Sequence, residues 1–144
     1  GRIKGKERNA LNLIPIVMEV ASGVREEMQI FGNDYETHDG TGIRDYIHVS
    51  DLAKAHVKAM GYIRNNNKDL MVNLATGEGH SVLDVIQKTK SVTGKEIAYQ
   101  IVGRRAGDPD KVIAVSNKAE EVLKWSPNYS DLDTLIKSTW EVYK

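Results

Sequence analysis

Cysteine is absent from this sequence of 144 residues. Its absence excludes disulfides, thiolate metal sites and cysteine nucleophiles, and it fits a reducing compartment, so we expect a cytoplasmic protein. No apolar run approaches the roughly 20 residues that span a bilayer, so no membrane partner is expected. An excess of charge of either sign is also missing, because 20 basic residues balance 20 acidic ones. A nucleic-acid partner is therefore not indicated.

Several motifs that carry chemistry are missing as well. The sequence contains no G-x-G-x-x-G for a dinucleotide, no G-x-x-x-x-G-K-[ST] for a triphosphate, no H-E-x-x-H for zinc and no G-x-S-x-G nucleophile elbow. The segment Gly77-Glu78-Gly79 comes nearest to a dinucleotide loop, but it lacks the third glycine, and we interpret it as a tight turn. The four histidines are scattered without ligand spacing, so no metal site is predicted.

The hydrophobic periodicity that is present predicts helices mixed with strands. Helices are expected over residues 12–21 and after four serines that would cap them, Ser50, Ser81, Ser116 and Ser130. Two of these serines should form capping boxes, Ser81 with Asp84 and Ser130 with Asp133. Strands are expected at Met28–Phe31, Ile43–Val49, Leu70–Ala75 and Glu96–Gly103. This mixture predicts an α/β or α+β fold, and the length fits one domain or one piece of a larger one, residues 1–144.

Two segments carry arginines beside glycine-rich turns at the ends of predicted strands. They contain Arg44, which follows Gly42, and Arg105, which precedes Gly107. Because one guanidinium can hold two phosphate oxygens, two arginines from separate segments would clamp a diphosphate. Asp108 could accept hydrogen bonds from a ribose hydroxyl. The alternative at this point is that both arginines lie on a solvated surface.

Three stretches in the first half, IFGNDY at residues 30–35, DGTGIRDYIHV at 39–49 and DLA at 51–53, resemble the hallmark segment of UDP-galactose 4-epimerases. Later motifs of that family follow in the same order, namely VNLATG at 72–77, SVLDV at 81–85 and RRAGD at 104–108, and NLIP at 12–15 precedes them all. The resemblance extends from about Asn9 to Tyr143. These enzymes belong to the extended short-chain dehydrogenase/reductase superfamily, in which a larger amino-terminal part holds NAD and a smaller carboxy-terminal part holds the UDP-sugar. The resemblance implies that this chain is the carboxy-terminal part.

The resemblance also implies roles for individual residues. Asn12 and Leu13 would contact the phosphate region of the nucleotide sugar, Gln29, Ile30 and Phe31 would flank the uracil, Arg44 and Arg105 would hold the diphosphate, Asp108 would hold the ribose, and Tyr46 would lie close by. The sequence departs from the family at two positions. Leu11 replaces a second asparagine, so one polar contact is expected to be missing. Val112 replaces a tyrosine that narrows the sugar pocket, a pattern associated with N-acetylated sugars.

The reaction implied by the resemblance interconverts UDP-glucose and UDP-galactose by transient oxidation at C4 with NAD. The family's general base is the tyrosine of a Tyr-x-x-x-Lys motif, which this sequence lacks. We therefore expect no catalytic residue here, no NAD bound by this chain alone and no turnover. The expected partners are UDP-glucose or UDP-galactose, the missing amino-terminal NAD-binding domain and, in the full-length enzyme, a second copy forming a homodimer.

Two alternatives remain open. One is another dehydratase, decarboxylase or epimerase of the same superfamily, and the other is a non-catalytic nucleotide-sugar-binding or regulatory module. The resemblance implies that residues 12–21, 50–60 and 70–75 pack against or extend the cofactor domain, so their apolar faces should leave a sizeable surface exposed in the isolated chain.

Overall fold

The computed structural model describes residues 5–7 and 9–144. In these residues the chain forms the helices α1 (Leu13–Ala21), α2 (Val49–Asn66), α3 (Val82–Thr93), α4 (Asn117–Leu123) and α5 (Leu132–Tyr143). The strands are β1 (Met28–Phe31), β2 (Ile43–Arg44), β3 (His80–Ser81), β4 (Tyr99–Val102) and β5 (Lys111–Val112). The mixed α/β fold predicted from the sequence is confirmed. None of the described helices is long and apolar enough to cross a membrane.

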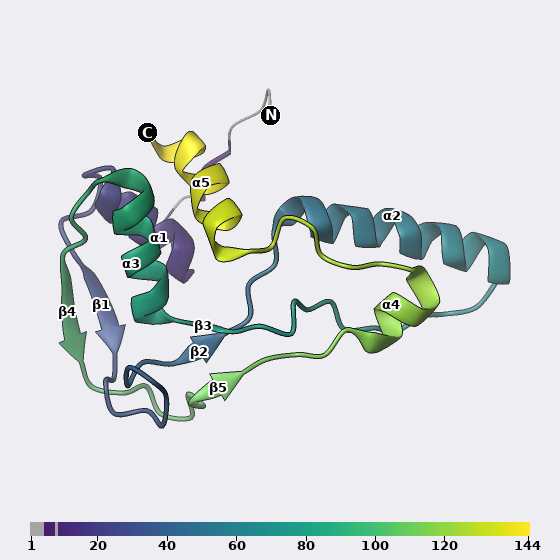
Figure 1. Cartoon of the computed structure of the whole chain (residues 1–144), viewed down its shortest axis with the longest axis horizontal. Helices are drawn as coiled ribbons and strands as arrows, with labels where there is room; N and C mark the ends of the chain where they lie inside the picture. The colour runs from purple at the N-terminus through teal and green to yellow at the C-terminus, as the bar shows by residue number, and fades with distance from the viewer. Residues whose placement is uncertain (1–4, 8) are drawn as a thin grey trace.

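A three-helix lobe forms one end of the molecule, where α1, α3 and α5 pack against one another beside the β1–β4 pair (Figure 1). The apolar stripes of the three helices supply its core, which includes Met18, Ile86 and Ile136. Burial of such side chains stabilises each of them by about 1.5–3 kcal/mol, so this core is the main source of order in the lobe. Strand β1 runs parallel to β4, and Phe31 pairs with Val102 at the end of the ladder.

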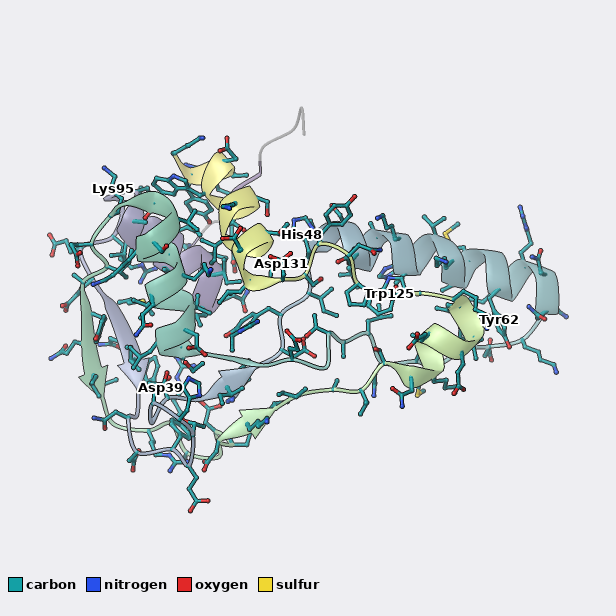
Figure 2. The ribbon with its side chains drawn as sticks, in the orientation of Figure 1. Asp39, His48, Tyr62, Lys95, Trp125 and Asp131 are labelled. Atoms are coloured by element: carbon teal, nitrogen blue, oxygen red, sulfur yellow. The ribbon has the colours of Figure 1, made fainter. Side chains whose placement is uncertain are left out.

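A second, smaller core lies between α2 and α4, which extend away from the lobe (Figure 1). Trp125 is its largest buried side chain, and its indole Nε1–H donates to the backbone oxygen of Asp51 at 2.9 Å. Figure 2 shows Trp125 on the connection between α4 and α5, next to α2. This bond anchors the long α2 helix at its amino-terminal end, while the opposite face of α2 stays open.

A small sheet connects the lobe to this arm. Strand β2 lies in its centre, antiparallel to β3 and parallel to β5. Arg44 therefore comes opposite His80 on one side and Val112 on the other. The sheet brings the amino end of β2 close to the loop that follows β4, since the Ile43 amide donates to the backbone oxygen of Asp110.

Three of the predicted strands differ from the structure. Only Ile43–Arg44 of the predicted strand Ile43–Val49 is paired, and the predicted strand Glu96–Gly103 is shortened to Tyr99–Val102. Leu70–Ala75 forms no strand, although Leu70, Val72 and Leu74 pack against the core of the arm. A strand needs a neighbour for its backbone hydrogen bonds, and no described strand lies beside these residues.

Helix capping follows the prediction at Ser81 and departs from it elsewhere. Ser81 and Asp84 form the expected capping box. The cap of α2 is His48 and not Ser50, because the His48 ring accepts a hydrogen bond from the Ser50 amide. Ser116 precedes α4 without a side-chain bond to it.

Helix α5 is capped by Asp131, whose side chain accepts from the Thr134 amide, so the predicted box of Ser130 with Asp133 is wrong. The Ser130 hydroxyl instead donates to buried Asp51 at 2.8 Å. The Ser130 hydroxyl therefore binds a residue that is distant in the sequence and does not cap α5, although the local sequence predicted that it would.

Candidate functional site

A cavity of about 220 Å³ lies where the lobe meets the small sheet. It is lined by Leu11, Leu13, Ile16, Met28, Gln29, Ile30, Phe31, Tyr35, Gly42, Arg44, Tyr46, Val82, Arg105 and Asp108. Its volume is below the roughly 300–1,000 Å³ of pockets that enclose a drug-sized ligand. The cavity can therefore hold part of a large ligand, with the remainder outside it.

Eight of the ten residues selected from the sequence line this one cavity. They are Leu13, Gln29, Ile30, Phe31, Arg44, Tyr46, Arg105 and Asp108. They come from α1, β1, the β2 segment and the loop after β4, so only the tertiary fold brings them together. Their convergence places two cations and one carboxylate against an apolar wall.

Asn12 and Val112 are not among the residues that line it. Asn12 is the residue before α1, and its exposed amide donates to the Glu7 carboxylate at 3.4 Å. Val112 lies on β5 opposite Arg44, with 48% of its surface exposed. Leu11, which replaces the family's second asparagine, does line the cavity and adds an apolar surface there.

Phe31 and Arg105 form a stacked pair on the cavity wall. The guanidinium carbon of Arg105 lies 3.6 Å from the centre of the Phe31 ring. The ring restrains the guanidinium in one plane while leaving its N–H groups free at the edge, which suits a group that binds an anion. No described carboxylate forms an ion pair with Arg105.

Arg44 is held by two bonds inside the chain. Its Nη1 donates to the backbone oxygen of Ile43 at 2.8 Å, and its Nη2 donates to the Asp108 carboxylate at 3.1 Å. Both side chains are about one-third exposed, so the ion pair is open to solvent and weak. A phosphate oxygen can compete with the carboxylate for this guanidinium.

Tyr46 contributes a hydroxyl to the same cavity. Burial raises the pKa of Tyr46 to about 12, against a smaller opposite effect of the Arg44 charge. The phenol therefore stays protonated at neutral pH and can donate a hydrogen bond.

Sequence reasoning missed several residues that form the wall. Tyr35 is 5% exposed and follows the turn after β1, while Met28 and Val82 supply apolar surface. Tyr35 is the last residue of the IFGNDY motif, so the sequence signal for it is its place in that motif. For Val82 the sequence showed only a helix stripe, which does not distinguish a cavity wall from a core position.

In the candidate dinucleotide turn, Gly77-Glu78-Gly79, the space at Gly79 is filled by the protein itself, while a Cβ atom at Gly77 would have no described atom close to it. A Cβ atom at Gly79 would lie 2.5 Å from side-chain atoms of both Ile113 and Ile43. Glycine is needed at this position because apolar side chains approach the backbone. This packing supports the interpretation of the segment as a tight turn.

One further cluster of polar residues is engaged in structural hydrogen bonds. His38, Asp39 and Asp84 lie close enough to hold a metal ion. The Ser81 hydroxyl donates to Asp39, and the Ser81 amide donates to Asp84 at 2.9 Å. These bonds fasten the loop of residues 33–42 to the start of α3, which is a structural role.

The chain is similar to known proteins in sequence and in fold. The family model described as GDP-mannose 4,6 dehydratase matches residues 2–139. The UDP-glucose 4-epimerase of Streptococcus mutans is 46% identical over 129 residues, which are 90% of this chain and 39% of that protein. The chain thus spans about two-fifths of the length of the curated relatives that it matches.

Solved structures of UDP-glucose 4-epimerases are also similar to this chain. The UDP-glucose 4-epimerase of Brucella ovis in complex with NAD has a TM-score of 0.94 and 40% identity, covering 99% of this chain and 44% of that one. The enzyme of Stenotrophomonas maltophila with bound NAD and formylated UDP-arabinopyranose has a TM-score of 0.90 and 42% identity, covering 95% and 40%. The predicted resemblance to the carboxy-terminal portion of UDP-galactose (UDP-glucose) 4-epimerases is confirmed. The chain belongs to the family of the GDP-mannose 4,6 dehydratase model, and the relatives that it resembles within that family are UDP-glucose 4-epimerases.

Proposed function

We propose that residues 1–144 are the nucleotide-sugar-binding part of a UDP-glucose 4-epimerase and that the cavity holds the UDP moiety of UDP-glucose or UDP-galactose. The observation that carries this proposal is the convergence of Arg44, Arg105 and Asp108 on one cavity beside Phe31. Two guanidinium groups match a diphosphate, a carboxylate matches a ribose diol, and an aromatic wall matches a uracil ring. Asn12 would reach the ligand only from outside the described cavity.

The chemistry of the proposed reaction belongs to groups outside this chain. NAD supplies the hydride acceptor when it is bound, and the tyrosine and lysine of the Tyr-x-x-x-Lys motif are not present here. The cofactor site of the proposed enzyme would lie in the amino-terminal part of the full-length protein, because this chain lacks the glycine motif of a dinucleotide-binding loop. The role of the residues in this chain is to bind and orient the nucleotide sugar.

The open face of α2 supports docking of that amino-terminal part. Val57 and Met60 are each 70% exposed, and Val49, Leu52 and Ile63 lie on the same side of the helix. A contiguous apolar face of this kind marks an interaction surface. Residues 70–75 belong to no described helix or strand and would add a strand to the sheet of the cofactor domain. The proposal also includes that the full-length enzyme is cytoplasmic and forms a homodimer.

Val112 leads to a proposal on substrate range. Its side chain is small and half-exposed beside Arg44, which would leave room for an N-acetyl group on the sugar. The complete enzyme should then convert UDP-N-acetylglucosamine, and replacement of Val112 by tyrosine should suppress that conversion more than conversion of UDP-glucose. Absence of turnover with UDP-N-acetylglucosamine would remove this part of the proposal.

The test of the proposed function is titration of the chain with UDP by calorimetry. We expect saturable binding that Arg44→Ala and Arg105→Ala each weaken by about tenfold or more, because each loses a charge-assisted hydrogen bond. Lys88→Ala, a cation on α3 that does not line the cavity, is the matched control and should leave the affinity unchanged. Saturable UDP binding whose affinity is unchanged by both arginine substitutions would reject this cavity as the site.

A further inference from the structure

We propose that the ion pair of Arg104 with Asp110 sets the separation of Arg44 and Arg105, and that it thereby positions both arginines for a nucleoside diphosphate. This inference rests on the proposed function of the cavity. Arg104 itself does not line the cavity and makes its contacts within the protein. It is a positioning residue, and Arg105 beside it is the residue that faces the ligand.

Arg104 is fixed where the chain leaves β4. Its Nη2 donates to the Asp110 carboxylate at 2.7 Å, and its guanidinium carbon lies 3.9 Å from the centre of the buried Tyr35 ring. A Cβ atom at Gly32 would come within 2.5 Å of the Arg104 Cγ, so the stem of Arg104 lies directly on the turn that ends β1. The orientation of the next residue, Arg105, is therefore tied to β1 and to the Phe31 ring.

Asp110 extends the connection to the other arginine. Its backbone oxygen accepts a hydrogen bond from the Ile43 amide at 2.9 Å, and its carboxylate also accepts from the Glu36 amide at 2.9 Å. Ile43 immediately precedes Arg44 on β2. One ion pair thus links Arg104, the covalent neighbour of Arg105, to Asp110, which is hydrogen-bonded to the covalent neighbour of Arg44.

The physical consequence concerns ligands that contact both arginines at once. A diphosphate bridges the two guanidinium groups, so its affinity depends on their separation. A monophosphate uses mainly one of them and is insensitive to that separation. Loss of the Arg104–Asp110 pair should therefore weaken UDP binding and leave UMP binding nearly unchanged.

The test compares UDP and UMP affinities of the whole chain by calorimetry. Arg104→Met and Asp110→Asn should each lower the UDP affinity about tenfold and change the UMP affinity by no more than about twofold. The double substitution should cost no more than either single one, because both remove the same connection. Arg104→Lys keeps the charge and should restore most of the preference for UDP.

The outcomes separate this inference from the proposed function. The side chain of Lys90 is about as exposed as that of Arg104 and pairs with the exposed Glu96 away from the cavity, so Lys90→Met should not alter the UDP-to-UMP ratio. Equal losses for UDP and UMP in the Arg104 and Asp110 variants, or no loss, would overturn the positioning role. A wild-type chain that binds neither nucleotide would instead reject the cavity as a nucleotide site. Melting temperatures close to the wild-type value would exclude unfolding as the cause.

Discussion

The guanidinium of Arg105 lies over the ring of Phe31, with its central carbon 3.6 Å from the ring centre. The parallel pairing of β1 with β4 produces this contact, since Phe31 pairs with Val102 and the loop after β4 then returns across the ring. The stack holds the proposed diphosphate-binding arginine in place before a ligand arrives. The interaction is worth about 1 kcal/mol at a partly exposed site.

Replacement of Phe31 by leucine should therefore weaken UDP binding about fivefold, because Arg105 loses its aromatic support. Phe31→Tyr keeps the ring and should remain near the wild-type affinity. Calorimetric titration measures both. The matched control is Tyr129→Leu, which removes the stack of Lys54 on Tyr129 away from the cavity and should not change the affinity. An unchanged affinity of the Phe31→Leu chain would show that the stack has no part in binding.

Asp51 is the buried carboxylate on which the junction between α2 and α5 depends. Its Oδ2 accepts hydrogen bonds from the amides of Asn128 and Tyr129 and from the Ser130 hydroxyl, at 2.7–2.9 Å. Asp51→Ala would leave these donors unpaired in a buried site, so we expect a loss of about 3 kcal/mol in the free energy of unfolding. Chemical denaturation measures it, and the exposed Asp69→Ala should change stability by less than about 0.5 kcal/mol.

The same residue predicts a pH dependence. Burial raises the pKa of Asp51, but the hydrogen bonds from Tyr129, Ser130 and Asn128 together lower it more, so the pKa in the folded chain lies below its usual value. A lowered folded pKa contributes stability above about pH 4, the unfolded value, and that contribution is lost as the pH falls through the folded pKa. The stability difference between wild type and Asp51→Ala should therefore narrow as the pH is lowered from 7 to about 2. A difference that stays constant would contradict the assignment.

Gly40 is required by the loop that leads into β2. Its φ is 79°, and a Cβ atom there would overlap the backbone oxygen of Asn33. Gly40→Ala should destabilise the chain by about 3 kcal/mol, because both the left-handed backbone and the overlap oppose a side chain. Gly61 in α2 has no atom near such a Cβ, so Gly61→Ala should gain up to about 1 kcal/mol. Thermal unfolding measures the stability of both variants and should show a lower melting temperature for Gly40→Ala and a higher one for Gly61→Ala. Equal melting temperatures would disprove the prediction.

The exposed face of α2 should make the isolated chain self-associate. Val57→Lys combined with Met60→Lys places two charges on this face and should reduce association without loss of stability, since both side chains are 70% exposed. Sedimentation velocity at several concentrations measures the effect. Val24→Lys alters a side chain that is 72% exposed and lies outside the helix, and it should leave the association unchanged. A wild-type chain that sediments as a monomer throughout would contradict the prediction.

Local sequence signals were sufficient to predict the structure where the hydrogen-bonding groups of a segment find their partners within that segment. The capping box of Ser81 with Asp84 was predicted correctly, because its donors and acceptors lie within four residues. Ser130 was assigned wrongly because its hydroxyl bonds to Asp51, a residue distant in the chain. The strand predicted at residues 70–75 is missing for a related reason, since its apolar pattern was read correctly but a strand also needs a partner.

The site shows the same division. The motif resemblance pointed to ten residues, and eight of them line the cavity. Asn12 and Val112, which were selected on the same grounds, lie outside it. Arg104 and Arg105 are adjacent and chemically alike, so their different roles could not be read from the sequence. Only the packing of Gly32 and Tyr35 against one side chain, and of Phe31 against the next, separates them.

The sequence by itself determined the family, the helix stripes and the absence of a dinucleotide loop and a Tyr-x-x-x-Lys motif, because these depend on residue type and local spacing. The tertiary structure decided which arginine faces the cavity, which hydroxyl caps a helix and which apolar face stays open. Those outcomes depend on side chains competing for partners that are distant in the chain, and that competition is resolved only when the backbone brings the partners together.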